Sequence, residues 1–295
     1  LGKITKIMSK NIKTLSLSQF NFSELRVYSS FKDIVKLVNK TDSIGLVPTM
    51  GSLHDGHLSI IKKALIKDDM VIVSIYVNPK QFNDPLDLKK YPRNLEDDLD
   101  KLKIFNKIIV YAPNDRDVYN GEEEVKRYNF GKITEIMEGR LRPGHFDGVA
   151  TVVEKLLSMF KPNNAYFGEK DFQQLLLIKE LVRKIKLDVN IIGCETIRER
   201  DGLAMSSRNK FLNKSERKSA SQIIKLLERA KKTYNTSIPK NIKSNILKHA
   251  NSIDNLKVEY FEIIDVSEFF KDKKEIRAFI ACKIGNTRLI DNIRI

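Results

Sequence analysis

The chain has 295 residues, of which 41% are hydrophobic and 31% charged, a length that accommodates about two domains. Its longest apolar run, Met70 to Val77, matches one buried strand and falls well short of the roughly 20 residues that cross a bilayer, which excludes a helical membrane protein. The net charge of +15 makes a nucleic-acid-binding protein the alternative of another class, but basic and acidic residues are interleaved throughout, so we expect no nucleic-acid partner and no membrane partner.

The cysteines and the N-terminal residues indicate the cellular compartment in which the protein works. Cys194 and Cys282 form neither a disulfide framework nor a metal motif, so we expect buried thiols in a reducing compartment. Residues 1–24 carry several Lys and Ser and no acidic residue before Glu24, and they lack the apolar run of a secretory signal. We therefore predict a basic, disordered extension on a cytoplasmic protein, with an organelle transit peptide as the alternative.

Strand and helix patterns alternate from residue 25 to about residue 200. The patterns predict, in chain order, a helix at 30–39, a strand at 44–47, a turn at 50–56 that opens a helix, a strand at 70–77, a helix at 95–103, a strand at 107–111, a helix at 149–159, a strand at 165–167, a helix at 172–185 and a strand at 189–194. Near-continuous apolar strands separated by helices indicate a doubly wound, Rossmann-like parallel sheet, whose ligands bind at the carboxyl ends of the strands.

The pattern changes after about residue 200. A helix is expected at 214–233, an interruption at Pro239, a helix at 241–250, and strands at 257–264, 276–283 and 287–290. We therefore expect an α/β domain at 25–200 and a small α+β domain at 201–295.

The segment from Pro48 to His57 follows a strand and opens a helix. Gly51 and Gly56 let the backbone turn sharply, and the N–H groups of a helix start combine with His54 and His57 into a phosphate site. An imidazolium there neutralises or protonates a departing phosphate oxygen. Solvated loop histidines or half of a zinc site are the alternatives, although neither cysteine lies nearby in sequence.

His54-x-Gly-His57 resembles the phosphate-binding signature of nucleotidyltransferases and class I aminoacyl-tRNA synthetases. The longer string from Pro48 to His57 is similar to the pantothenate synthetase family, and the resemblance extends over residues 25–295. It implies an enzyme that condenses (R)-pantoate with β-alanine, using ATP and Mg²⁺, through a pantoyl adenylate. It also implies a homodimer, and a C-terminal domain that acts as a lid.

Later segments repeat the resemblance. They are Asn78-Pro-Lys-Gln81, the acidic run 96–98, the basic loop 139–146, the stretch 167–174 and the stretch 197–209. The resemblance implies that His57, His54 and Lys170 are catalytic, that Gln81, Gln174 and Asn78 bind pantoate or β-alanine, and that Asp98 coordinates the metal. It assigns ATP to Met50, Gly51, Ser52, Leu53, His54, Asp55, Gly56, His57, Gly168, Glu169, Lys170, Asp171, Ile197, Met205, Ser206, Ser207 and Arg208.

Two features qualify this interpretation. Leu86-Asp87 stands where the family usually has Glu-Asp, which affects local loop contacts but no catalytic role. A cytidylyl- or adenylyltransferase that shares only the His-x-Gly-His site is the close alternative, and the two glutamines argue against it because they suit a small polar acid. The ending 285–292 also matches the family, and we interpret it as structural.

Overall fold

The computed structural model describes residues 25–38, 41–121, 124–269 and 275–295. The predicted extension at 1–24 lies outside the described residues. Within them, no helix is long and apolar enough to cross a membrane.

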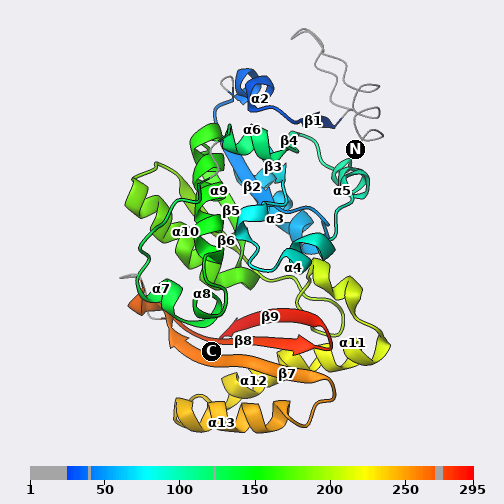
Figure 1. The fold of residues 1–295 in the computed structure, drawn as a ribbon, viewed down its shortest axis with the longest axis vertical. Coiled ribbons are helices and arrows are strands. Elements are labelled where there is room, and N and C mark those ends of the chain that lie inside the picture. Colours follow the sequence, from blue (N-terminus) through cyan, green and yellow to red (C-terminus); the bar gives the residue numbers. More distant parts are fainter. Residues whose placement is uncertain (1–24, 39–40, 122–123, 270–274) are drawn as a thin grey trace.

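A six-stranded parallel sheet forms the larger part of the molecule (Figure 1). Its order is β1-β4-β3-β2-β5-β6, so the chain moves outward from β2 in one direction through β3 and β4, then returns to the other side of β2 with β5. The strands are β1 (Arg26–Tyr28), β2 (Ile44–Thr49), β3 (Met70–Ile75), β4 (Ile108–Tyr111), β5 (Asn164–Gly168) and β6 (Asn190–Cys194). The predicted doubly wound sheet is confirmed, and its switch point lies between β2 and β5.

Helices cover both faces of this sheet. Leu46 of β2 belongs to a core built with helices α9 and α10, whereas its neighbour Val47 belongs to a second core built with α3 and α5. The helices of this part are α2 (Phe31–Val38), α3 (Asp55–Lys67), α4 (Pro85–Lys90), α5 (Leu95–Leu102), α6 (Asp115–Tyr119), α7 (Lys132–Glu135), α8 (Met137–Leu141), α9 (His145–Phe160) and α10 (Phe172–Ile185). Burial on both faces explains the continuous apolar strands of the sequence.

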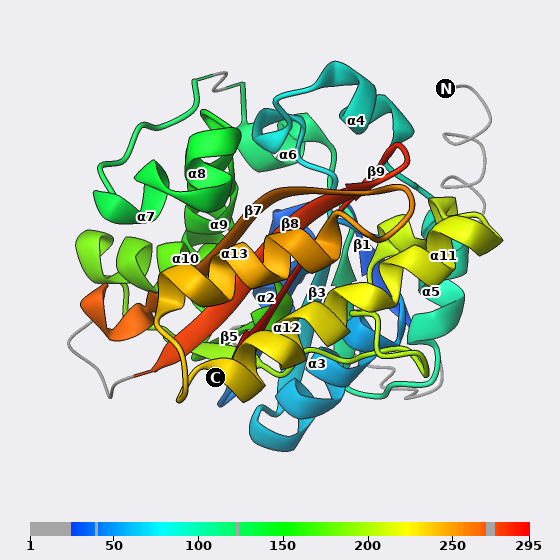
Figure 2. The same cartoon turned by 90° about the horizontal axis from the view of Figure 1, so that it is seen from below.

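An antiparallel sheet of order β7-β8-β9 forms the smaller part, below the parallel sheet in Figure 1. One face packs against α12 and α13, which lie across it in Figure 2, and the other face adds Tyr260 and Phe279 to the core around α9 and α10. The elements are α11 (Lys214–Ala220), α12 (Gln222–Thr233), α13 (Pro239–Ala250), β7 (Leu256–Asp265), β8 (Ile276–Ile284) and β9 (Thr287–Arg294). The smaller sheet is therefore buried on both sides.

Several predicted boundaries were wrong. The helix expected at 214–233 is two helices that meet at Ser221, and Pro239 begins α13, where a proline loses no helical hydrogen bond. Strand β2 continues through Pro48 to Thr49. This is tolerated because β5 pairs only with Gly45 and Leu46, so Pro48 faces no ladder on that side.

Candidate active site

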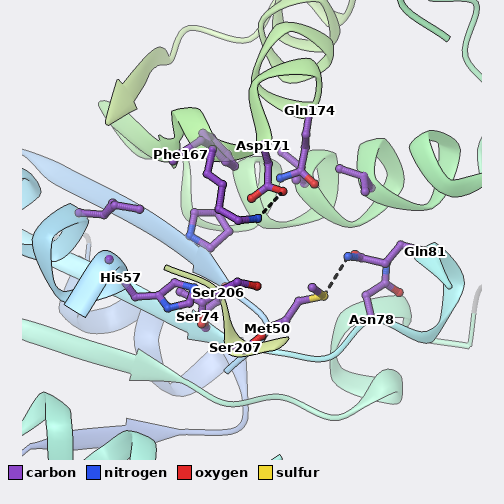
Figure 3. Close-up of a pocket in the computed structure, with 18 of the residues that line it drawn as sticks. Met50, His57, Ser74, Asn78, Gln81, Phe167, Asp171, Gln174, Ser206 and Ser207 are labelled. Atoms are coloured by element: carbon purple, nitrogen blue, oxygen red, sulfur yellow. Dashed lines mark hydrogen bonds and ion pairs between the residues drawn. The ribbon is translucent and has the colours of Figure 1, made fainter. Parts of the chain in front are cut away.

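A cavity of about 240 Å³ opens at the carboxyl ends of β2, β3 and β5, at the switch point of the sheet. Most of the predicted site residues line it, and Figure 3 shows several of their side chains converging from separate elements. The predicted residues in the lining are Met50, His54, Gly56, His57, Asn78, Gln81, Gly168, Lys170, Asp171, Gln174, Ile197, Met205, Ser206, Ser207 and Arg208. Gly51, Ser52, Leu53, Asp55, Glu169 and Asp98 are not among the described residues that line it.

The turn after β2 presents the start of α3 to the cavity. Gly51 has a φ of 75°, a conformation that favours glycine, and the next residue, Ser52, is also left-handed with a φ of 52°. His54 is the N-cap of α3, and its backbone N–H donates to Nδ1 of His57 at 3.3 Å. The two imidazole centroids are 4.1 Å apart. Because His54 is the N-cap and His57 lies in the first turn, both rings are at the positive end of a 13-residue helix.

Burial makes both imidazoles neutral at physiological pH. Burial, then the nearby Lys170 ammonium, lowers the pKa of His54 to about 4. Burial lowers the pKa of His57 to about 3, with His54 and Lys170 contributing. In the ligand-free protein the rings are therefore neutral hydrogen-bonding groups, and the imidazolium expected at a departing phosphate oxygen stays a prediction for the ATP-bound state.

Asp98 lies behind the turn that opens α3 and is not among the described residues that line the cavity. It lies on α5 with only 1% of its surface exposed, and its two carboxylate oxygens accept the backbone N–H groups of Ser52 at 2.8 Å and Leu53 at 2.6 Å. The carboxylate therefore holds the left-handed turn in place from behind. Each Asp98 oxygen thus already accepts one backbone N–H, and the role of Asp98 as a magnesium ligand stays a prediction.

Asn78 fixes the orientation of Gln81. Its Oδ1 accepts the N–H of Lys80 at 3.2 Å, and its Nδ2 donates to the carbonyl of Gly148 at 3.1 Å, so two backbone groups define which end of the amide is which. The Nδ2 group also donates to Oε1 of Gln81 at 3.2 Å. The Gln81 Nε2 group is consequently free of that contact and lies beside Met50 in the cavity (Figure 3).

Asn78 itself is 1% exposed, and its Oδ1 also accepts the hydroxyl of Tyr119 at 2.7 Å. Asn78 therefore orients Gln81, and its own polar atoms are largely taken up by protein contacts. Helix α9 approaches this turn closely at Gly148, where an added Cβ would collide with the carbonyl oxygen of Lys80.

Lys170 and Gln174 come from the junction of β5 and α10. Nζ of Lys170 lies 3.6 Å from a carboxylate oxygen of Asp171, and its side chain retains 19% exposure. Gln174 lies in the first turn of α10 and reaches the cavity from a different element than Gln81 (Figure 3). The predicted cation and both predicted amides thus share one cavity.

The stretch from 205 to 208 forms another wall. Ser206 caps a short 3-10 helix at Ser207–Phe211, and Met205 donates its N–H to the carbonyl of Ile197 at 3.0 Å. Arg208 pairs with Asp87 at 3.0 Å, so the carboxylate of the unusual Leu86-Asp87 pair contacts a predicted ATP residue. The side chain of Leu86 is 61% exposed and contributes no such contact.

Arg142 and His145 line the cavity as well, although neither was among the predicted site residues. The predicted basic loop at 139–146 is largely helical, because α8 ends at Leu141 and α9 begins at His145. Nε2 of buried His145 lies 3.0 Å from Nη1 of Arg142, and its Nδ1 lies 2.7 Å from the carbonyl oxygen of Gln81. The motif Arg-Pro-Gly-His was the available signal, since it brings two cavity-lining basic residues to a helix start.

The fold and this cavity define a doubly wound α/β protein with an anion site at its switch point. Residues 24–294 match the family model described as pantoate-beta-alanine ligase. The chain belongs to this family, as its motifs indicated.

Relatives and solved structures agree. The chain is 48% identical over 257 residues to the pantothenate synthetase of Flavobacterium psychrophilum, covering 85% of this chain and 91% of that protein. A crystal structure of pantothenate synthetase from Thermus thermophilus superposes with a TM-score of 0.83 at 33% identity, covering 91% of this chain and 99% of that one. Pantoate-beta-alanine ligase from Francisella tularensis, complexed with beta-gamma ATP and beta-alanine, gives a TM-score of 0.78 at 37% identity, covering 92% and 98%.

Proposed function

We propose that this cavity is the active site in which the chain, a ligase, condenses pantoate with β-alanine in an ATP-dependent reaction. The observation that carries the proposal is that a helix start, two imidazoles and a lysine line the same cavity as two glutamine amides. The first group suits phosphates, and the second suits a small acid with hydroxyl groups.

The reaction divides into two steps. A pantoate carboxylate oxygen attacks the α-phosphorus of ATP, the bond to the bridging oxygen breaks, and pyrophosphate leaves. The amine of β-alanine then attacks the acyl carbon of the pantoyl adenylate, loses a proton, and AMP leaves with the former anhydride oxygen. Positioning and charge stabilisation supply the catalysis, with no covalent bond to the protein.

Lys170, His54 and His57 are the groups placed for the phosphates. The lysine supplies positive charge, and the neutral imidazoles donate N–H groups to oxygens on which charge develops. A bound polyphosphate also raises the pKa of each ring, because a nearby anion favours the imidazolium. Ser206, Ser207 and Arg208 face the same cavity and complete the donor set, with Ile197 proposed at the adenine.

The acid is proposed to lie between Gln81 and Gln174. Because Asn78 occupies Oε1 of Gln81, the Nε2 group is the end available to donate to a pantoate oxygen. The apolar residues Val149, Val152 and Val153 of α9 line the same cavity and suit the two methyl groups of pantoate.

We treat Mg²⁺ as the counter-ion that ATP brings with its phosphates. Among the described residues no group of three or more His, Cys, Asp or Glu side chains is arranged to hold a metal.

We further propose, from the family resemblance, a cytoplasmic homodimer whose residues 201–295 act as a lid over residues 25–200. Light scattering after size exclusion measures the oligomeric state. A dimer has twice the chain mass of 34.0 kDa.

Measuring pyrophosphate with ATP, Mg²⁺ and pantoate before any amine is added tests the function. We expect about one equivalent of pyrophosphate per active site, as one adenylate accumulates, and AMP only after β-alanine is added. Release of pyrophosphate and AMP only when all three substrates are present contradicts the adenylate, and no turnover with pantoate contradicts the substrate.

A further inference from the structure

The last strand of the chain reaches two predicted ATP loops at once. Asp291 and Asn292 are adjacent on β9, and each is 3% exposed. We propose that Asp291 and Asn292 are positioning residues of the ATP site, which hold the turn that carries Lys170 and the loop that carries Ile197. The inference rests on the proposed function, since it assumes that these loops bind ATP.

Asn292 holds the Lys170 turn by its backbone. Its Nδ2 donates to the carbonyl oxygen of Glu169 at 2.9 Å and to that of Lys170 at 3.0 Å. Its Oδ1 accepts from Nη1 of Arg277 at 2.7 Å. Since a guanidinium only donates and a carbonyl only accepts, the orientation of the amide is unambiguous.

Arg277 locks this arrangement from β8. Its Nη2 donates to the Glu169 carboxylate at 2.7 Å, and its guanidinium carbon lies 3.8 Å from the ring centroid of Phe172. The segment 169–172 is therefore held through a side chain, two carbonyls and a ring, all by residues of the small sheet. A flexible lysine side chain that starts from a fixed backbone reaches fewer wrong positions.

Asp291 holds the second loop. Its two carboxylate oxygens accept from Arg198 at 2.6 and 3.0 Å, a bidentate pair next to Ile197 in the sequence. Nη1 of Arg198 also donates to the carbonyl of Gly202 at 3.1 Å, which closes the loop on itself.

Neither Asp291 nor Asn292 is among the described residues that line the main cavity, although both border a smaller cavity of about 40 Å³ behind Lys170. They act through other residues, and the interpretation of 285–292 as merely structural is too narrow. The expected signature is a loss of nucleotide affinity that exceeds any loss of acid affinity.

Isothermal titration of Asn292→Ala and Asn292→Asp with a non-hydrolysable ATP analogue, and separately with pantoate, tests the proposal. The aspartate variant keeps the size and the Arg277 contact but cannot donate to the carbonyls. For both variants we expect the Kd of the analogue to rise about tenfold or more, the effect of losing a buried donor, while the Kd of pantoate changes by less than about threefold. Asp291→Asn weakens the Arg198 pair and leaves an amide oxygen that can still accept the Asn292 N–H, so it provides a separate arm with the same expected direction.

Ile246→Val is the matched control, because Ile246 is 1% exposed in the core of the smaller sheet and lies on α13, which packs against β7 and α12. It should leave both Kd values unchanged despite a lower melting temperature. In a Lys170→Ala background, Asn292→Ala should change the analogue Kd by less than about twofold, since the group it positions is gone.

Three results would each overturn the positioning role. They are an equal loss of affinity for the ATP analogue and for pantoate, an unchanged Kd of the analogue, and a full effect of Asn292→Ala in the Lys170→Ala background. Failure of the wild-type protein to bind the analogue refutes the proposed function instead. If an Asn292 variant does not fold, the Asp291→Asn arm decides.

Discussion

At the scale of single residues, the site depends on side chains whose polar ends are fixed by the backbone. Asn78 is the clearest example, because Lys80 N–H and the Gly148 carbonyl assign its two ends and thereby assign those of Gln81. Asn78 thus sets which end of the Gln81 amide faces the cavity, the end that we propose donates to pantoate.

Replacing Asn78 by Asp tests this relay. A carboxylate cannot donate to Oε1 of Gln81, so the glutamine amide turns over and presents its carbonyl to an anionic acid. We expect the Kd of pantoate to rise at least about tenfold, corresponding to about 1.4 kcal/mol, with a smaller change for an ATP analogue. Titration calorimetry measures both values.

Asn106→Asp is the charge-matched control, because Asn106 is exposed in the bend before β4. If Asn78→Asp remains as damaging when Gln81 is already alanine, Asn78 acts by itself and the relay is wrong.

At the scale of elements, the turn between β2 and α3 depends on helix α5. The Asp98 carboxylate, held behind the turn, satisfies two N–H groups that a left-handed turn leaves without a partner in the ladder. Burial raises the pKa of Asp98, and the two backbone hydrogen bonds oppose that rise.

Asp98→Asn should therefore destabilise the protein by about 1–3 kcal/mol, since an amide accepts one N–H and confronts the other with a donor. Urea unfolding measures this. Asp97→Asn, next in sequence but paired at the surface with Lys101, should cost much less.

The same two variants separate a structural from a metal-binding role. With a structural Asp98, the Mg²⁺ concentration for half-maximal rate is the same in Asp98→Asn as in the wild type. An increase of several-fold in that requirement would restore Asp98 as a ligand.

At the scale of the whole molecule, three imidazoles of lowered pKa couple folding to pH, one of them buried (His145) and two half-buried at the cavity (His54 and His57). Burial lowers the pKa of His54 and of His145 to about 4 and that of His57 to about 3, from an ordinary value of 6.5. The unfolded chain therefore binds more protons than the native protein between about pH 6.5 and 4, so the free energy of unfolding falls as pH falls through this window.

Urea unfolding at intervals between about pH 8 and 4.5 measures this dependence. We expect a flat region above about pH 7 and a progressive loss below about 6.5. His57→Gln should make the loss shallower, because one depressed imidazole is removed. An equally steep loss in the variant would place the effect elsewhere.

Much of the fold and of the candidate site was predictable because short-range signals encode it. Two-sided burial produced the apolar strands, and the Gly-His turn, the Lys170 turn and both glutamines were readable as motifs after strands. The resemblance assigned Asp98 to the metal by its position in the motif, and the acidic run alone does not show which of Glu96, Asp97 and Asp98 faces the turn. Helical spacing does separate them, since Asp98 and Leu102 lie one turn apart and both are buried.

Other features had no local signal. No Gly or Pro near Ser221 marks the break between α11 and α12. The contacts of Asn292 with Glu169 and Lys170 join segments more than 120 residues apart, and a single sequence does not show such pairs.

At Gly148, helix α9 approaches the backbone of Lys80 so closely that only the hydrogen atom of a glycine fits between them. A methyl group there would push the turn of Lys80 and Gln81 outward, since it would lie far inside any ordinary carbon–oxygen contact and the atom it meets is backbone. Gly148→Ala should weaken pantoate while penalising bulkier 3-substituted hydroxy acids less, so the ratio of their kcat/KM values shifts toward the larger acid. Competition between pantoate and a 3,3-diethyl analogue measures that ratio. If the acid lies between Gln81 and Gln174 as proposed, substrate range depends on the clearance between the backbones of Gly148 and Lys80, and widening it requires no new polar contact.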